Sequence, residues 1–421
     1  MRTTAESAKA GAAARRTAFG KVAPNLVKAL GLASTTWKAP QRVPAYTYFY
    51  GDDRELNIVV CEGESPGNVD KALAYALAHV GNRTLSLILQ EGLALPTQQR
   101  LVGLRTDVRL YTYQDCAATP MESKKLTLGG LKELEEVASI RGGVHNLGAR
   151  ENWVEGIIDW ADGLAPSLVQ ANRSSYRAWH CLGRQLLKLN TTSKGIDVLA
   201  GVNYGKPTEV QPAPVKLSLN GPISDKESWR VKEAVLRGII SRQAGDDSEA
   251  HLEHQMQAAL MARAEKLTGS MKVGLRREVP AKRPGGGTGF IDFVFVDTQG
   301  VLHLVETKIG ADPMLVLQGL DYWLWAKVNR KLLEKELNVK RITDVQLDFV
   351  LGERDGTLVA PRTSVLRLDA PAQLQQLRSD IPWRLARVTG WLRKDPTVQQ
   401  LQIGEIPDTE FMTGKIAKKS K

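Results

Sequence analysis

The stretch GFIDFVFVDTQGVLHLVETKIG, Gly289 to Gly310, constrains the fold of this chain more than any other segment. Two runs rich in large apolar residues flank the turn-forming tripeptide TQG, a pattern that predicts a β-hairpin buried in a sheet. Asp292 nevertheless lies inside the first run, and Glu306 and Lys308 close the second. A carboxylate buried among apolar strands costs free energy unless it has a partner. These charged residues therefore need an explanation beyond fold stability.

The spacing of the charged residues places them on defined faces of the two strands. Side chains alternate between the faces of a strand, so Glu306 and Lys308 project together, and Asp292 shares a face with Val294 and Val296. Mg²⁺ prefers oxygen ligands. A lysine supplies positive charge near an attacking water or a phosphate. The pattern therefore predicts a site for Mg²⁺ or Mn²⁺ beside a phosphate.

The helix expected over residues 314–328 adds two polar side chains to this site. Gln318 and Tyr322 are four residues apart and share one face of that helix. Only a short loop separates the helix from Lys308, so its first half is tethered near the end of the strand.

The helix expected over residues 246–267 precedes the hairpin. Its residue Glu253 flanks the apolar stripe and can reach the same site, and Glu249, one turn earlier, is the alternative. Between this helix and the hairpin we expect a flexible loop over residues 276–289. Lys282 and Arg283 in that loop are candidate contacts to a nucleic-acid backbone.

This set of residues resembles the PD-(D/E)xK nuclease superfamily. The family motif reads FID at Phe290–Asp292 and ETK at Glu306–Lys308, and QGLDY at Gln318–Tyr322 matches the QxxxY helix motif of RecB-type members. Glu253 matches the acidic residue often seen on the family's first helix. Ile291 stands where the name-giving proline would stand. The resemblance covers about residues 245–355 and leaves the first half of the chain unassigned.

The resemblance implies a fold, an activity and a role for each matched residue. The fold would be a restriction-endonuclease-like α/β core of helix, central hairpin, helix and strand. Asp292, Glu306 and the carbonyl of Thr307 would coordinate the metal, with Glu253 binding it directly or through water. Lys308 would orient or help deprotonate the attacking water. Gln318 and Tyr322 would position the phosphate or the lysine, and the substrate would be DNA more readily than RNA.

Each of these features also has a purely structural explanation. Glu306 and Lys308 fit a cross-strand ion pair of little energetic value, Asp292 fits a bulge cap, and Gln318 and Tyr322 fit ordinary helix-surface positions. One alternative function is therefore a non-catalytic nucleic-acid-binding or assembly protein. Another is an effector gated by a nucleotide near the GESPG loop, Gly63–Gly67, although a plain turn between strand and helix fits that loop as well.

The rest of the chain suggests two domains between basic ends. Residues 45–115 alternate strands with helices, as in parallel βαβ units, and residues 126–189 are expected to be mostly helical. Strands are expected at 196–205 and 214–221, a strand at 344–353 and a helix at 371–393. The predicted division is a basic arm (1–44), an α/β and helical domain (45–225), a nuclease-like domain (226–400) and a basic tail (401–421).

The composition indicates a protein of the cytoplasm with an anionic partner. The net charge of +11 matches the charge of the two ends: residues 1–44 hold eight basic residues against one glutamate, and residues 415–421 add four lysines. Such arms suit phosphate contacts, and solvated tails explain them equally well. Three widely spaced cysteines suggest neither disulfides nor zinc. No apolar run is long enough to span a membrane. A homo-oligomer is left open, and the layout suggests a bacterial antiviral or restriction-type effector.

Overall fold

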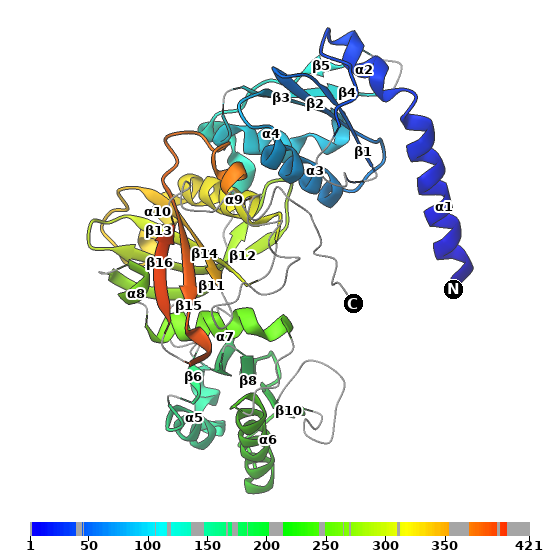
Figure 1. Ribbon diagram of the computed structural model, residues 1–421. Helices are drawn as coiled ribbons and strands as arrows, with labels where there is room; N and C mark the ends of the chain where they lie inside the picture. The colour runs from blue at the N-terminus through cyan, green and yellow to red at the C-terminus, as the bar shows by residue number, and fades with distance from the viewer. Residues whose placement is uncertain are drawn as a thin grey trace, which may run out of the picture.

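The protein is a mixed α/β structure built on three sheets (Figure 1). The computed structural model describes residues 2–401, apart from residues 39–43, 45, 106, 116–118, 136–146, 166, 171–175, 183, 202–213, 244–248, 264, 269–270, 310–311, 353–369 and 394–395. No helix in these ranges is both long and apolar enough to cross a bilayer. Cys61 and Cys181 are buried, and Cys116 lies outside the described residues.

The helices and strands are bounded as follows. The helices are α1 Arg2–Phe19, α2 Ala23–Ala29, α3 Pro66–His79, α4 Leu95–Arg100, α5 Glu155–Asp162, α6 Asp225–Gln243, α7 Glu249–Ala262, α8 Glu265–Thr268, α9 Leu315–Val328 and α10 Arg330–Glu336. The strands are β1 Thr47–Gly51, β2 Glu55–Val60, β3 Thr84–Gln90, β4 Val108–Tyr113, β5 Met121–Glu122, β6 Val169–Gln170, β7 Tyr176–Cys181, β8 Arg184–Thr191, β9 Ile196–Ala200, β10 Val215–Leu219, β11 Met271–Lys282, β12 Thr288–Asp297, β13 Leu302–Lys308, β14 Val345–Gly352, β15 Trp383–Thr389 and β16 Thr397–Leu401.

The first sheet, β1 to β5 in chain order, confirms the expected parallel βαβ pattern. Strands β2, β3 and β4 run parallel, with α3 and α4 in the connections. Ser65 caps α3 by accepting a hydrogen bond from the backbone of Asn68. Part of the basic arm docks here, since Phe19, Leu26 and Val27 pack in the core beneath the sheet.

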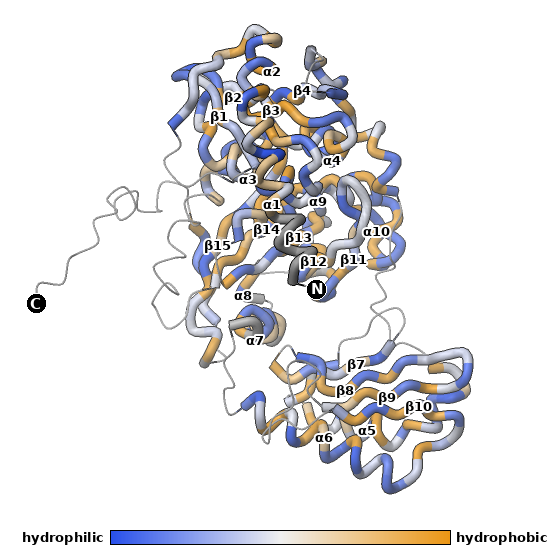
Figure 2. The backbone as a smooth tube through the Cα atoms, turned by 90° about the vertical axis from the view of Figure 1, so that its right-hand side faces the viewer, coloured by the Kyte–Doolittle hydropathy of each residue, from blue (hydrophilic) through white to orange (hydrophobic). Residues whose placement is uncertain are grey.

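The middle sheet, ordered β10-β9-β8-β7-β6, corrects the expectation that residues 126–189 are mostly helical. Within that range α5 is the longest helix of the described residues, and β6, β7 and most of β8 are strands. Aromatic residues such as Trp179 favour strands, and Trp179 is fully buried in β7. Helix α6 packs on this sheet through Val231 and Val235, so the range 45–225 spans two separate sheets (Figure 2).

The third sheet, β11 to β16 in chain order, contains the hairpin. β11, β12 and β13 are antiparallel, and β13, β14 and β15 are parallel. Residues 276–282, expected in a loop, belong to β11. This strand lies at the sheet edge, the part of a sheet where a proline such as Pro280 is tolerated. The helix expected over 371–393 is also wrong for residues 383–389, which form β15.

Helix α9 lies between the first and third sheets (Figure 1). It is apolar on nearly all sides, as a fully enclosed helix must be, and only Gln318, Lys327 and Val328 are not buried. A Cβ on Gly319 would lie 2.5 Å from the Phe349 ring, so this glycine allows α9 to approach β14 closely. On the opposite face of the third sheet, α7 packs through Leu252 and Met256. The hairpin is therefore enclosed on both faces.

Candidate functional site

The hairpin strands separate at the end that carries the charged residues. Pairing between β12 and β13 ends at Phe293 and Val305, so Asp292 has no partner residue on β13. Its carboxylate Oδ2 instead accepts hydrogen bonds from the backbone N–H and the Oγ1 hydroxyl of Thr307, both at 2.8 Å. Asp292 thus occupies the gap between the two strands. The two hydrogen bonds to its Oδ2 fix the orientation of its carboxylate. No described residue donates a hydrogen bond to its other oxygen.

Glu306 projects from the centre of the third sheet toward the α9 side, on the same face as Leu302 and Leu304. The residue is 4% exposed, and its Oε1 has no hydrogen-bond partner among the described residues. Burial, and then the nearby carboxylate of Asp292, raise the pKa of Glu306 well above its usual range. A buried carboxylate oxygen without a donor is costly. It is also a ready ligand for a cation.

Lys308 at the end of β13 is surrounded by carboxylates. Its Nζ donates to Glu253 Oε1 of α7 at 3.2 Å, with side chains 18% and 29% exposed. Burial alone would lower the pKa of Lys308, but Glu253, Asp292 and Glu306 together raise it. Burial raises the pKa of Glu253, and Lys308 opposes that shift. The lysine is therefore a fixed positive charge at the solvent-facing end of the cluster.

A chain of hydrogen bonds from α7 and β11 fixes Thr307 and, through it, Asp292. Gln257 Nε2 donates to Thr307 Oγ1 at 2.8 Å, and Arg277 donates to Gln257 Oε1 at 2.9 Å. Arg277 also contacts His254 Nδ1 at 3.0 Å. The sequence pattern did not identify Gln257 as a site residue, although it follows Glu253 by four residues and lies on the same helix face. Its amide orients the hydroxyl that holds the carboxylate.

Tyr322 of α9 binds the hairpin backbone. Its hydroxyl donates to the carbonyl of Phe290 at 3.2 Å, and a Cβ at Gly289 would come within 2.6 Å of that hydroxyl. Burial, then the charge of Glu306, raise the pKa of Tyr322. Gln318 has a buried Oε1 without a partner among the described residues. No hydrogen bond joins either side chain to Lys308, so here Tyr322 positions β12 instead of the lysine.

Arg283 is committed to a buried ion-pair network. Its Nε and Nη2 donate to Asp321 Oδ2 at 3.1 and 3.0 Å. Asp321 is fully buried and also receives Arg100 of α4, whose Nε and Nη2 donate at 2.7 and 2.9 Å. Arg100 reaches Asp70 of α3 as well. Asp321 therefore joins α9 to the first sheet's helices through Arg100 and to the β11–β12 connection through Arg283, while Lys282 is half-buried at the end of β11.

The donor set fits a hard divalent cation at Asp292 and Glu306. Both carboxylates hold an oxygen that receives no hydrogen bond from described residues, and Thr307, whose carbonyl is the third candidate ligand, directly follows Glu306 in β13. No group of three His, Cys, Asp or Glu side chains in the described ranges is close enough to hold a metal. Water and the Thr307 carbonyl would thus complete the ligand set, as is usual for Mg²⁺. The side chain of Glu249 lies outside the described residues.

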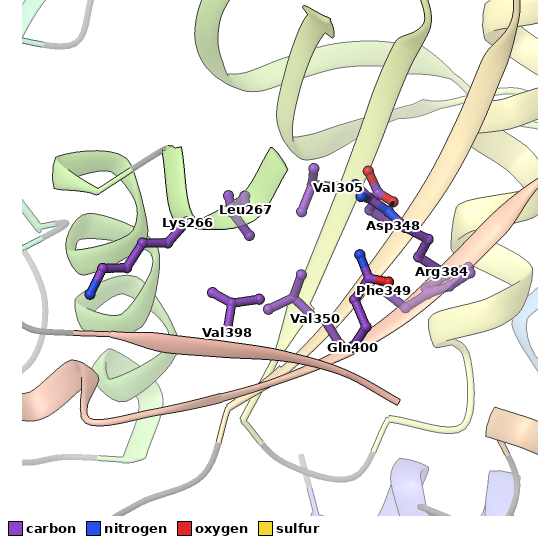
Figure 3. Close-up of a pocket in the computed structure, with 10 residues that line it drawn as sticks. Lys266, Leu267, Val305, Asp348, Phe349, Val350, Arg384, Val398 and Gln400 are labelled. Atoms are coloured by element: carbon purple, nitrogen blue, oxygen red, sulfur yellow. Dashed lines mark hydrogen bonds and ion pairs between the residues drawn. The ribbon is translucent and has the colours of Figure 1, made fainter. Parts of the chain in front are cut away.

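A separate pocket lies on the opposite face of the third sheet, with about 450 Å³ of open space (Figure 3). Val305 and Val350 form part of its apolar wall, and Asp348 and Arg384 lie together at one end. Asp348 already accepts hydrogen bonds from Arg384 at 2.6 Å and from His303 at 2.7 Å. The pocket includes none of the hairpin carboxylates, so it is not part of the candidate site.

The GESPG loop after β2 is held by contacts between its Glu64 and side chains of α1 and α3. Glu64 is buried and accepts hydrogen bonds from Arg16 at 2.8 and 2.9 Å and from Asn68 at 2.7 Å. These contacts pin α1 to the start of α3. They give the loop a structural role that needs no bound nucleotide.

Replacing Glu306 by glutamine is expected to stabilise the metal-free protein. The folded-state pKa of Glu306 lies above its unfolded value of about 4.3, so the folded state holds more protons between the two values and stability falls as pH rises through that window. Glu306→Gln should gain about 1–3 kcal/mol at pH 8 in EDTA and nothing at pH 3.5. Denaturant unfolding of the wild type and of Glu306→Gln at both pH values measures the difference in stability. Equal stabilities of the two proteins at pH 8 would contradict the presence of an unpaired buried charge at Glu306.

The structure brings Asp292, Glu306, Thr307, Lys308 and Glu253 into one cluster. It places Tyr322 against the adjoining backbone, and it directs Arg283 to Asp321 instead of to the site. A scan of protein-family models finds no match to this chain, and a search of curated protein sequences finds no relative.

Proposed function

We propose that this chain is a metal-dependent nuclease that hydrolyses phosphodiester bonds in DNA. One observation carries the proposal: two carboxylates, each with an oxygen open to a ligand, meet a fixed lysine charge where the hairpin strands separate. Structural roles alone do not account for Glu306, because a buried carboxylate oxygen without a donor, its Oε1, opposes folding. A cation at this point supplies the missing partner.

Each residue has a chemical task in this proposal. Asp292, Glu306 and the Thr307 carbonyl would hold a divalent ion, which would supply a Lewis acid for a phosphate and for a bound water. Lys308 lies beside the carboxylates and faces solvent, where its charge orients the scissile phosphate and stabilises developing negative charge. Thr307 and Gln257 hold Asp292 in place, and Glu253 holds Lys308.

The alternative of a non-catalytic nucleic-acid-binding protein with this fold has one observation in its favour. Lys308 and Arg283 both form ion pairs within the chain, as in a site kept only for structure. Such a protein would bind nucleic acid without cutting it. A role as an antiviral or restriction effector stays a prediction from the layout of the chain.

Cleavage should require Mg²⁺ or Mn²⁺ and should stop in EDTA. The test incubates the full chain with plasmid, linear duplex, single-stranded DNA and RNA, first in EDTA and then after excess Mg²⁺ is restored. The expected result is DNA cleavage that appears only with the metal, because the open ligands at Asp292 and Glu306 are oxygens. Undiminished cutting in EDTA would contradict the metal mechanism, and binding without cutting in any metal would favour the non-catalytic alternative.

A further inference from the structure

Helix α6 carries an apolar stripe on its solvent-facing side. Trp229, Leu236 and Ile240 are 62%, 43% and 66% exposed, and their spacing of seven and four residues puts them on one face. Val231 and Val235 on the other face pack against the middle sheet. Figure 1 shows α6 at the end of the molecule away from the first sheet. Nothing in the described chain covers this stripe.

The stripe holds half of the large hydrophobic side chains that are exposed on the described surface. The other exposed ones, Leu95, Met121 and Phe290, lie on separate elements. Single exposed apolar residues are ordinary, but several aligned on one helix indicate a contact surface. Burying an indole of this size contributes strongly to association.

The charges beside the stripe are arranged for pairing with a second copy of the same helix. Glu233 and Arg237 flank its centre and form an exposed ion pair one turn apart. Two α6 helices can pack antiparallel about a two-fold axis that crosses each helix at the level of Ala234 and Val235. Trp229 of one copy then lies opposite Ile240 of the other. With the axis at this level, Glu233 of one copy also lies opposite Arg237 of the other. Self-complementarity of this kind is what a two-fold interface requires.

We propose that two copies of this chain associate through α6 in an antiparallel, two-fold helix pair. Trp229 of each copy packs against Ile240 of the other, Leu236 lies next to the axis, and Glu233 and Arg237 form two ion pairs between the copies. A single helix pair is a small interface, so the dimer dissociates on dilution. The inference is independent of the proposed nuclease activity.

Charge reversal at the two flanking positions tests the pairing. Sedimentation velocity of the full chain at a series of concentrations should show a dimer for the wild type and monomers for Glu233→Arg and for Arg237→Glu. Each variant alone places four like charges around the axis. An equimolar mixture of the two restores both pairs, so it should again sediment as a dimer, at least tenfold more readily than either variant alone.

Matched controls separate the interface from general effects of charge and folding. Lys216→Glu changes an exposed charge on β10, away from the stripe, and should leave the dimer intact. An exposed ion pair within one helix contributes little to stability, so both variants should melt near the wild-type temperature. A wild-type chain that stays monomeric at the highest concentration would overturn the proposal and would leave the stripe to a different protein. Dimers that persist in Glu233→Arg, or a mixture that fails to associate, would overturn it equally.

Discussion

Replacing Lys308 by alanine is expected to lower the single-turnover rate of DNA cleavage by about 10²–10³-fold while leaving DNA affinity nearly unchanged. Groups that act chiefly on the transition state have effects of this size on rate and little effect on ground-state binding. Lys308 is half-buried at the end of β13 and contributes charge to the cluster of carboxylates but little to the core. Its removal therefore takes away a catalytic charge and little packing.

The control for this prediction comes from the partner of the lysine. Removing Lys308 leaves Glu253 without its cation, so the single variant should lose about 1 kcal/mol of stability. The double variant Lys308→Met with Glu253→Gln keeps the volume and removes both charges, and it should regain stability without regaining cleavage. A purely structural ion pair predicts the same loss of stability in the single variant but the wild-type cleavage rate. Rates near wild type in either variant would refute the catalytic role.

Replacing Arg100 by methionine is expected to produce the largest loss of stability, about 3–5 kcal/mol. Arg100 and Asp321 are 1% and 0% exposed in their side chains, so removing one leaves the other as a buried charge with a single remaining partner. Asp321 keeps only Arg283 in this variant, and Asp70 loses its partner. Denaturant unfolding of the full chain measures the loss.

Arg105 offers a matched comparison because its ion pair with Asp107 is partly exposed, at 26% and 35%. Arg105→Met should cost about 1 kcal/mol or less. The double variant Arg100→Met with Asp321→Leu should be more stable than Arg100→Met alone, because the two fully buried charges are removed together and the charges that lose a partner, Arg283 and Asp70, are partly exposed. Equal losses for Arg100→Met and Arg105→Met would show that the buried network does not join the first and third sheets energetically.

Local patterns predicted the elements that surround the candidate site. The apolar runs in Phe290–Val296 and Leu302–Val305 around the turn TQG indicated the hairpin, and the apolar run after Pro313 indicated α9. The charged residues of ETK and FID were informative because they break those patterns. Local sequence is a sufficient guide where one period of hydrophobicity dominates a segment.

The errors arose where tertiary context overrides local composition. β11 contains charged residues and Pro280, so it reads as a loop until β12 supplies a partner and the sheet edge makes the proline harmless. β15 reads as helical because Trp383–Thr389 mixes arginines with aliphatic residues, and its place between β14 and β16 decides its conformation. In both cases pairing with a neighbouring strand determines the conformation of the segment, which its own sequence does not determine.

Long-range pairing explains the rest of what the sequence did not reveal. Arg100 and Asp321 are 221 residues apart along the chain, and nothing local links them. Arg283 was expected to contact nucleic acid because it lies in a basic, glycine-rich loop. In the structure its guanidinium donates hydrogen bonds to Asp321. Helical spacing alone places Gln257 on the same face as Glu253, four residues earlier. Its role depends on Thr307, which α7 meets only in the folded structure.

The most direct test of the metal-dependent site is a single-turnover cleavage time course on labelled duplex DNA with Mg²⁺, run in parallel for the wild type and Asp292→Asn. Asparagine keeps the shape of the side chain and can still accept from Thr307, but it removes the charge that would hold the ion. The wild type should cut and Asp292→Asn should show at least a hundredfold slower reaction with unchanged DNA binding. Equal rates for the two proteins, or no cleavage by the wild type in either Mg²⁺ or Mn²⁺, would contradict it.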